Sequence, residues 1–313
     1  MLHLRVICPP ERSDDVLRLL DEQPGVAHLV RLPGAALRPA GDMVEADVAR
    51  EAADETIAAL CGLGVDRDGG ITLEQIDTAL SDSADRAEEQ APGDAADAVV
   101  WEELLARTGE ESRLNGTFLA FLSIACLLAA VGVITGSTVT IVGAMVVGPE
   151  FGPLAAIAVG LVRRRWDLVR RAALALAVGF PLAMVLTAVG TVAGNAVGLF
   201  DTSALTENHE LDFVYDVGPW SLIVAVLAGA AGMLSMTSAK SAALVGVFIS
   251  VTTVPAAGYA SVALILGHWG RFGPSLGQLA VNLLGIVAAA TVVLLLHRRH
   301  HARNGPGRPL SKG

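Results

Sequence analysis

A long apolar run is interrupted at residues 143–153, GAMVVGPEFGP, by three glycines, two prolines and one carboxylate. Pro149 and Pro153 each lack an amide proton and clash with the preceding helical turn. Gly148 and Gly152 add backbone freedom. We therefore expect a helix to break near residue 148 and to restart near residue 154.

Glu150 lies at this expected break. Non-helical backbone at membrane depth persists only where protein buries it or where it lines water, and a carboxylate there is costly. Glu150 is therefore the first candidate for binding a cation or carrying a proton. The alternatives are a structural ion pair or a position at the rim of a vestibule.

A second stretch repeats this plan 103 residues later, since Ile141-Val142-Gly143 corresponds to Leu244-Val245-Gly246. Ser250, Thr252, Thr253, Pro255 and Gly258 follow in another apolar run. Each stretch is the middle of three hydrophobic segments. The hydroxyls of Thr252 and Thr253 are expected either to satisfy carbonyls that Pro255 leaves without a donor or to face an ion.

Charge divides the chain into an acidic part and an apolar part. Residues 1–117 carry a net charge of −15 and residues 118–313 a net charge of +5, in a chain that is 53% hydrophobic. An acidic soluble region argues against nucleic-acid binding, which needs a basic patch. The three cysteines are widely spaced and indicate neither a disulfide framework nor a zinc site.

Residues 1–80 show the pattern of a small α+β domain. Strands are expected at 2–8, 26–32, 43–48 and 71–76, with helices at 11–23 and 51–63, from their apolar periodicity. This βαββαβ order predicts a ferredoxin-like, ACT-like domain, with two helices on one face of an antiparallel sheet. Such a domain serves either structure and assembly or ligand sensing. Residues 81–117 are expected to form an acidic linker followed by an amphipathic helix.

Residues 118–297 contain six apolar segments of about the length that crosses a membrane, at 118–135, 137–162, 168–199, 219–238, 240–267 and 277–297. The turn 163–171 carries five arginines and the tail 298–313 is basic, whereas the loop 200–218 has five acids and no lysine or arginine. The positive-inside rule therefore predicts a multi-pass inner (plasma) membrane protein with both termini cytoplasmic.

Three segments per repeat is an odd number, so the second repeat must enter from the opposite side. Inverted repeats with a discontinuous middle helix are typical of secondary transporters. The two repeats, 118–199 and 219–297, are expected to superpose about an axis in the membrane plane.

Several motifs resemble an uncharacterised family of hydrophobic membrane proteins, domain of unknown function 389. They are VTIVGAMVVGP at 139–149 with Gly152-Pro153, GAAG at 229–232, LVGV at 244–247 with Pro255, and NLLGI at 282–286. The resemblance covers about residues 100–297 and implies a membrane fold without implying an activity. The family pattern has Ser-Pro followed by apolar residues where this chain has Gly148-Pro149-Glu150.

Two further sets of residues are candidates for packing or transport. Asn282 either lines a pathway for a solute or ion through the membrane or forms a hydrogen bond with a neighbouring helix. Gly190, Gly194 and Gly198 recur every four residues and are expected on one helix face, as an internal contact or as a contact between subunits. We expect a homo-oligomer, either a dimer or a trimer.

No nucleophile elbow, phosphate loop, dinucleotide fingerprint or metalloprotease helix occurs in the sequence, so no enzyme activity, cofactor or metal is expected. The first functional hypothesis is a membrane transporter or channel for a small solute or ion, with a regulatory cytoplasmic domain. The second is a membrane-anchored sensor or scaffold in which the soluble domain binds the ligand. A polar, hydrated cavity at Glu150 would favour the first.

Overall fold

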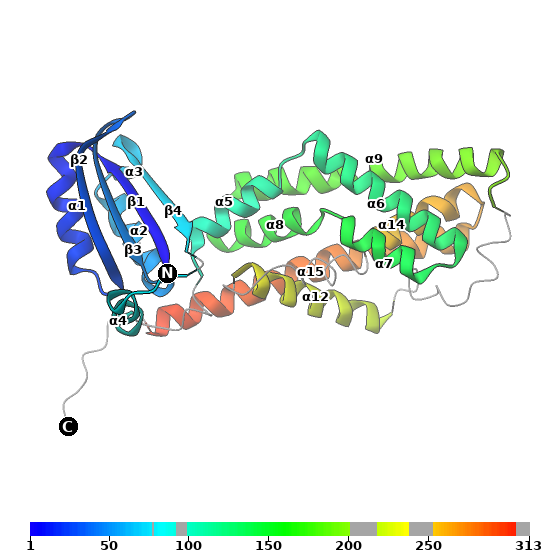
Figure 1. Cartoon of the computed structure of the whole chain (residues 1–313). Coiled ribbons are helices and arrows are strands. Elements are labelled where there is room, and N and C mark those ends of the chain that lie inside the picture. The colour runs from blue at the N-terminus through cyan, green and yellow to red at the C-terminus, as the bar shows by residue number, and fades with distance from the viewer. Residues whose placement is uncertain (77, 92–98, 201–217, 238–252, 305–313) are drawn as a thin grey trace, which may run out of the picture. The chain divides into compact units, whose positions relative to one another are not determined.

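The computed structural model describes residues 1–304, apart from residues 77, 92–98, 201–217 and 238–252 (Figure 1). The described chain forms two compact units, which divide between Glu103 and Leu104. The expected domain limits at residues 80 and 117 therefore differ from the observed division, which falls inside α5 (Trp101–Glu111).

The N-terminal unit is built on a four-stranded antiparallel sheet with the strand order β2-β3-β1-β4. Its elements follow the expected order with differences in length and one additional short helix, α3: β1 (Leu2–Cys8), α1 (Pro10–Glu22), β2 (Val26–Leu37), β3 (Ala40–Val48), α2 (Arg50–Gly62), α3 (Val65–Asp68) and β4 (Gly70–Gln75). The β2–β3 hairpin is longer than expected, because pairing continues to Leu37 and Ala40.

One face of this sheet forms the core of the N-terminal unit. Every second residue of β1 is buried, and these side chains pack with those of α1 and α2. The core includes Leu2, Leu4, Val6, Cys8, Val16, Leu20, Val44, Ala46, Val48, Ile57 and Leu60. Burial of one strand face against two helices explains why the alternating pattern of this region predicted its strands correctly.

Asp42 closes a polar network at one edge of that core. Its carboxylate accepts hydrogen bonds from the Ser13 hydroxyl, the Gly34 backbone N–H and the Arg31 guanidinium. These three donors lower the pKa of Asp42 from 3.8 to about 2, because each stabilises the ionised carboxylate. Asp42 therefore has a structural role in joining α1, β2 and β3.

The expected linker is partly helical. Residues 82–90 form α4 (Asp82–Gln90), and the Ser81 hydroxyl caps it by accepting a hydrogen bond from the Ser83 backbone N–H. Ala84 and Ala87 are buried on the inner side of this helix. Two buried alanines are enough to pack this acidic helix against its unit. The sequence did not predict the helix, because this segment contains no large apolar residues.

The second unit is a helical bundle (Figure 1). Its helices are the rest of α5, α6 (Gly116–Thr135), α7 (Thr138–Val147), α8 (Phe151–Arg163), α9 (Trp166–Ala196), α12 (Pro219–Thr237), α14 (Thr253–Ile265) and α15 (Trp269–Asn304). Among the described residues, four helices are long and apolar enough to cross a membrane, or up to five spans if α7 and α8 count as one bent span.

The expectation of six crossings differs from this description at the fifth segment. α14 has 13 residues, and the preceding part of the expected segment, 240–252, lies outside the described residues. The structure therefore supports a protein with several membrane helices and leaves six as a prediction.

Close helix contacts hold the bundle together at glycines. A Cβ atom at Gly258 of α14 would lie 2.7 Å from the Ala129 Cβ of α6. A Cβ atom at Gly229 of α12 would lie 2.5 Å from the Ile286 carbonyl oxygen of α15. Glycine at these positions allows the backbones to approach more closely than any side chain would permit.

Two turns of the bundle have the same backbone hydrogen bonds 103 residues apart. Four backbone hydrogen bonds recur in the turn between α8 and α9 and in the turn between α14 and α15. In the first turn they run from Arg164 N to Leu161 O, Arg165 N to Gly160 O, Leu168 N to Arg165 O and Val169 N to Arg165 O. In the second turn the corresponding bonds run from Gly267 N to Leu264 O, His268 N to Ala263 O, Arg271 N to His268 O and Phe272 N to His268 O. The helices α6 and α12 also begin 103 residues apart, as do α9 and α15.

Candidate functional site: a buried carboxylate at a helix break

The predicted helix break lies between α7 and α8. α7 ends at Val147, α8 begins at Phe151, and the two helices are bent by 50°. Gly148 and Pro149 form the break, because Pro149 has no amide proton to continue the ladder of α7. Pro153 falls in the first turn of α8, where backbone N–H groups have no partner within the helix, so it does not contribute a second break.

Glu150 immediately precedes α8, and its side chain is completely buried. Its Oε1 atom accepts a hydrogen bond of 2.6 Å from the Thr253 hydroxyl, and Thr253 is also completely buried. The two residues are 103 positions apart, which is the spacing of the two matching turns. The hydrogen bond therefore joins equivalent positions at the starts of α8 and α14.

Three other buried hydroxyls of the bundle are bonded within their own helices. Thr187, Thr191 and Ser261 each donate to the carbonyl oxygen four residues earlier. That arrangement satisfies the hydroxyl locally and requires no partner helix. Thr253 differs from these residues because its hydroxyl donates to a carboxylate of another segment.

Of the other two candidates at the start of α14, the structure describes Pro255 but not Thr252. Pro255 is buried in the first turn of α14, two residues after Thr253, and Pro153 is in the first turn of α8. Thr252 lies outside the described residues.

Asn282 is completely buried on α15, and so is Gln278 one helical turn earlier, with 1% of its surface exposed. Residues 279 and 286, on the same helix face as Asn282, belong to the apolar core that contains Leu154 and Val254. Both amides therefore lie on a face of α15 that is buried in the bundle. Gln278 was missed in the sequence, although its i, i+4 spacing from Asn282 is a usable signal.

The glycine candidates separate into different roles. A Cβ atom at Gly152 would lie 2.6 Å from the Glu111 Cβ, so Gly152 allows α8 to pack closely against the end of α5. A Cβ atom at Gly190 would lie 2.9 Å from Leu127 of α6, an internal contact.

Gly198 is not part of a glycine face on α9, which corrects the expectation for Gly190, Gly194 and Gly198. The helix ends at Ala196, and Gly198 has a φ of +70° in the turn that follows. Gly194 packs near Phe200, the residue that follows this turn. A four-residue spacing keeps residues on one face only while the helix continues.

Among the described residues, no group of three histidine, cysteine or acidic side chains is placed to hold a metal ion. The Glu150 carboxylate and the Thr253 hydroxyl supply oxygens, which are the ligands that a small hard cation or a proton prefers.

Comparisons with known proteins agree with the sequence motifs. The model of the family described as Domain of unknown function (DUF389) matches residues 145–288. An uncharacterised protein from Methanocaldococcus jannaschii is 22% identical over 207 residues, which is 66% of this chain and 62% of that relative. The chain thus spans less than two thirds of the relative's length. No solved structure matches.

The range that matches the family contains Glu150, Thr253 and Asn282. The expected resemblance is confirmed: the chain is similar to the DUF389 family across the segment that holds both sides of the candidate site.

Proposed function

We propose that this chain forms a membrane transporter or channel for a small solute or ion, with a pathway that passes between the starts of α8 and α14. The observation that carries the proposal is the buried hydrogen bond between Glu150 and Thr253. A charged side chain in the centre of a membrane helix costs about 2.5–3.5 kcal/mol on insertion scales. A site that uses the carboxylate accounts for its retention there.

An inverted 3+3 repeat with six membrane helices is part of the proposal. It is supported by the two matching turns and by the helices α6 and α12, and α9 and α15, which begin 103 residues apart. With three segments in each half, the halves have opposite directions across the membrane, as in secondary transporters. The start of α14 corresponds to the start of α8, and the residues equivalent to α7, 241–250, lie outside the described residues.

The orientation with both termini cytoplasmic is part of the proposal. The Arg298 guanidinium donates a hydrogen bond to the Val162 carbonyl oxygen, so the arginine-rich turn after α8 and the basic end of α15 lie at the same end of the bundle. Two basic segments at one end fit the positive-inside rule for that end. Cysteine labelling of residue 165 from outside the cell would contradict this orientation.

The N-terminal unit is proposed to regulate the membrane unit. Its strand order and all-antiparallel pairing support a ferredoxin-like fold, in which small ligand-sensing domains occur. A symmetric homo-oligomer, dimer or trimer, is proposed with it. Mass measurement in mild detergent and in nanodiscs tests this part, and a monomer in both would contradict it.

Ion-flux measurements on the full chain in proteoliposomes test the function. We expect currents or pH changes in response to jumps of Na⁺, K⁺ or H⁺, and loss of this response in Glu150→Gln. Thr253→Val is expected to weaken it, whereas Ser261→Ala is the matched control, because the Ser261 hydroxyl bonds within its own helix. All variants are first compared for folding and assembly.

A response that Glu150→Gln leaves unchanged would overturn the assignment of Glu150. An absence of flux for ions and for a panel of small solutes would favour the second hypothesis, a membrane-anchored sensor or scaffold. A thermal-shift screen of the same ions, amino acids and nucleotides at constant ionic strength then identifies what the N-terminal unit binds.

A further inference from the structure

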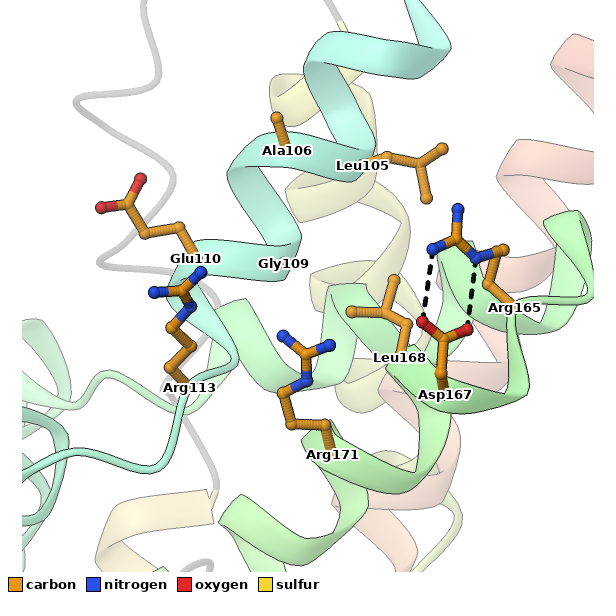
Figure 2. A pocket seen from close by; sticks show the side chains of 9 residues that line it. All are labelled: Leu105, Ala106, Gly109, Glu110, Arg113, Arg165, Asp167, Leu168 and Arg171. Carbon is orange, nitrogen blue, oxygen red and sulfur yellow. Dashed lines mark hydrogen bonds and ion pairs between the residues drawn. The ribbon is translucent and has the colours of Figure 1, made fainter. Parts of the chain in front are cut away.

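A pocket of about 510 Å³ lies in the second unit where the C-terminal part of α5 meets the start of α9. Figure 2 shows the residues that line it: Leu105, Ala106, Gly109, Glu110, Arg113, Arg165, Asp167, Leu168 and Arg171. Three arginines therefore line one pocket, although they come from two distant parts of the sequence.

The arginines of this pocket differ in how their charges are compensated. Arg165 forms an ion pair with Asp167, with Nε to Oδ1 and Nη2 to Oδ2 distances of 3.2 Å. The guanidinium groups of Arg113 and Arg171 have no hydrogen bond or ion pair to the residues that the structure describes. Both side chains line the same pocket, and in Figure 2 the Glu110 carboxylate points away from both.

Two guanidinium groups that line one pocket repel each other unless an anion lies between them. Each presents several N–H donors in a planar fork, and this fork matches the oxygens of a phosphate. Arg113 and Arg171 thus offer donors for two or more oxygens of one anion. Leu105 and Leu168 supply an apolar wall beside them.

The sequence around the pocket favours a position at the membrane surface. The apolar residues of α9 begin directly after Arg171, and α6 begins three residues after Arg113. Trp166, at the start of α9, exposes 59% of its surface, as is typical of aromatic residues at the headgroup level. Basic pockets at this level recognise anionic headgroups.

We propose that Arg113 and Arg171 bind a phosphate group in this pocket, carried either by an anionic lipid headgroup or by a soluble phosphate compound. The ligand site is separate from Glu150 and does not depend on transport activity. Arg165 is held by Asp167 and shapes the pocket wall.

Thermal unfolding and native mass spectrometry of the full chain test this assignment with defined probes. The lipid probe is phosphatidylglycerol in phosphatidylcholine nanodiscs, compared with nanodiscs of phosphatidylcholine alone. The soluble probe is inorganic pyrophosphate added to the protein in a neutral detergent. The variants are Arg113→Gln and Arg171→Gln, and the control is Arg170→Gln, which removes the same charge from the neighbouring exposed residue of α9.

We expect the wild-type chain and Arg170→Gln to bind at least one probe, and we expect Arg113→Gln and Arg171→Gln to lower its affinity about tenfold or more, as loss of a charge-assisted hydrogen bond predicts. Binding of phosphatidylglycerol without binding of pyrophosphate identifies a site for a lipid headgroup. Binding of pyrophosphate without binding of phosphatidylglycerol identifies a site for a soluble ligand. Equal losses in all three variants would indicate non-specific attraction and overturn the proposal, as would a wild-type chain that binds neither probe.

Discussion

The turn between α8 and α9 and the turn between α14 and α15 share a hydrogen-bonding pattern but have opposite compositions. Residues 163–165 are three arginines, whereas the equivalent residues 266–268 are leucine, glycine and histidine. The left-handed residue is Arg164 in the first turn, with a φ of +56°, and Gly267 in the second, with a φ of +76°. The same backbone geometry is therefore compatible with a highly charged sequence in one turn and an almost uncharged sequence in the other.

The halves also differ in how tightly equivalent helices pack. Gly258 of α14 touches α6, whereas the equivalent residue of α8, Ala155, carries a side chain and is completely buried. Gly229 of α12 touches α15, and its equivalent on α6 is Cys126. Similar elements thus pack with different residues, and substitutions at equivalent positions should have unequal effects.

Exchange of the two turn sequences should have the largest effect, because it changes the orientation of the whole chain. We expect a mixture of orientations when residues 163–165 become Leu-Gly-His and residues 266–268 become three arginines, since positive charge selects the cytoplasmic side. Protease access to a tag after residue 313 in sealed vesicles measures the fraction inverted. The control is the single exchange Arg165→His with His268→Arg. One uniform orientation in the full exchange would show that charge in these turns does not set the topology.

Gly258→Ala should destabilise the chain by about 1–3 kcal/mol, because overpacking forces the backbone of α14 away from α6. Thermal unfolding in detergent measures this change. Gly109→Ala is the matched control, since a Cβ atom there meets nothing within 4 Å. Equal unfolding temperatures for the two variants would contradict the close contact.

Thr253→Val should lower stability by about 1–3 kcal/mol, since a buried carboxylate loses a hydrogen bond. Ser261→Ala, in the same helix, should have a smaller effect because its hydroxyl bonds only to the carbonyl of Ala257 among the described residues. Both are measured by chemical or thermal unfolding in the same detergent. A smaller loss in Thr253→Val than in Ser261→Ala would count against the bond that joins the two halves.

The two left-handed turn residues should give the smallest effects, of opposite sign. Gly267→Ala should cost about 1–2 kcal/mol, because an L-residue is strained at positive φ. Arg164→Gly should stabilise the other turn by a similar or smaller amount, reduced by the greater entropy of glycine in the unfolded chain. Changes of the same sign in both variants would show that the turns are not equivalent.

The soluble unit was largely predictable because its signals are local. Alternation from Leu2 to Cys8 and the helical pattern after Pro10 required no knowledge of distant contacts. The helix break at Gly148 and Pro149 was predictable for the same reason, since a missing amide proton acts where it occurs. The expectation that Pro153 would also break the helix was wrong, because a proline in the first turn of a helix removes no hydrogen bond of that helix.

The sequence singled out Glu150 and Thr253 separately, as candidates in two interrupted apolar stretches, and did not identify Thr253 as the partner of Glu150. The offset of 103 residues was visible, but a few identities did not show that Glu150 and Thr253 meet. The arginine pocket was missed altogether, because Arg113 and Arg171 are brought together by the packing of α5 on α9. No periodicity within either segment carries that information.

The contact between Glu150 and Thr253 has a consequence for the origin of the chain. In the inverted repeat that we propose, equivalent positions that touch each other lie next to the axis that relates the two halves. In a dimer of identical half-length chains, such positions hold the same residue, so a carboxylate would meet a carboxylate or a hydroxyl a hydroxyl. Two buried carboxylates in contact repel each other or share one proton. Fusion of the copies into one gene allows the two positions to diverge, one into an acceptor and the other into its donor.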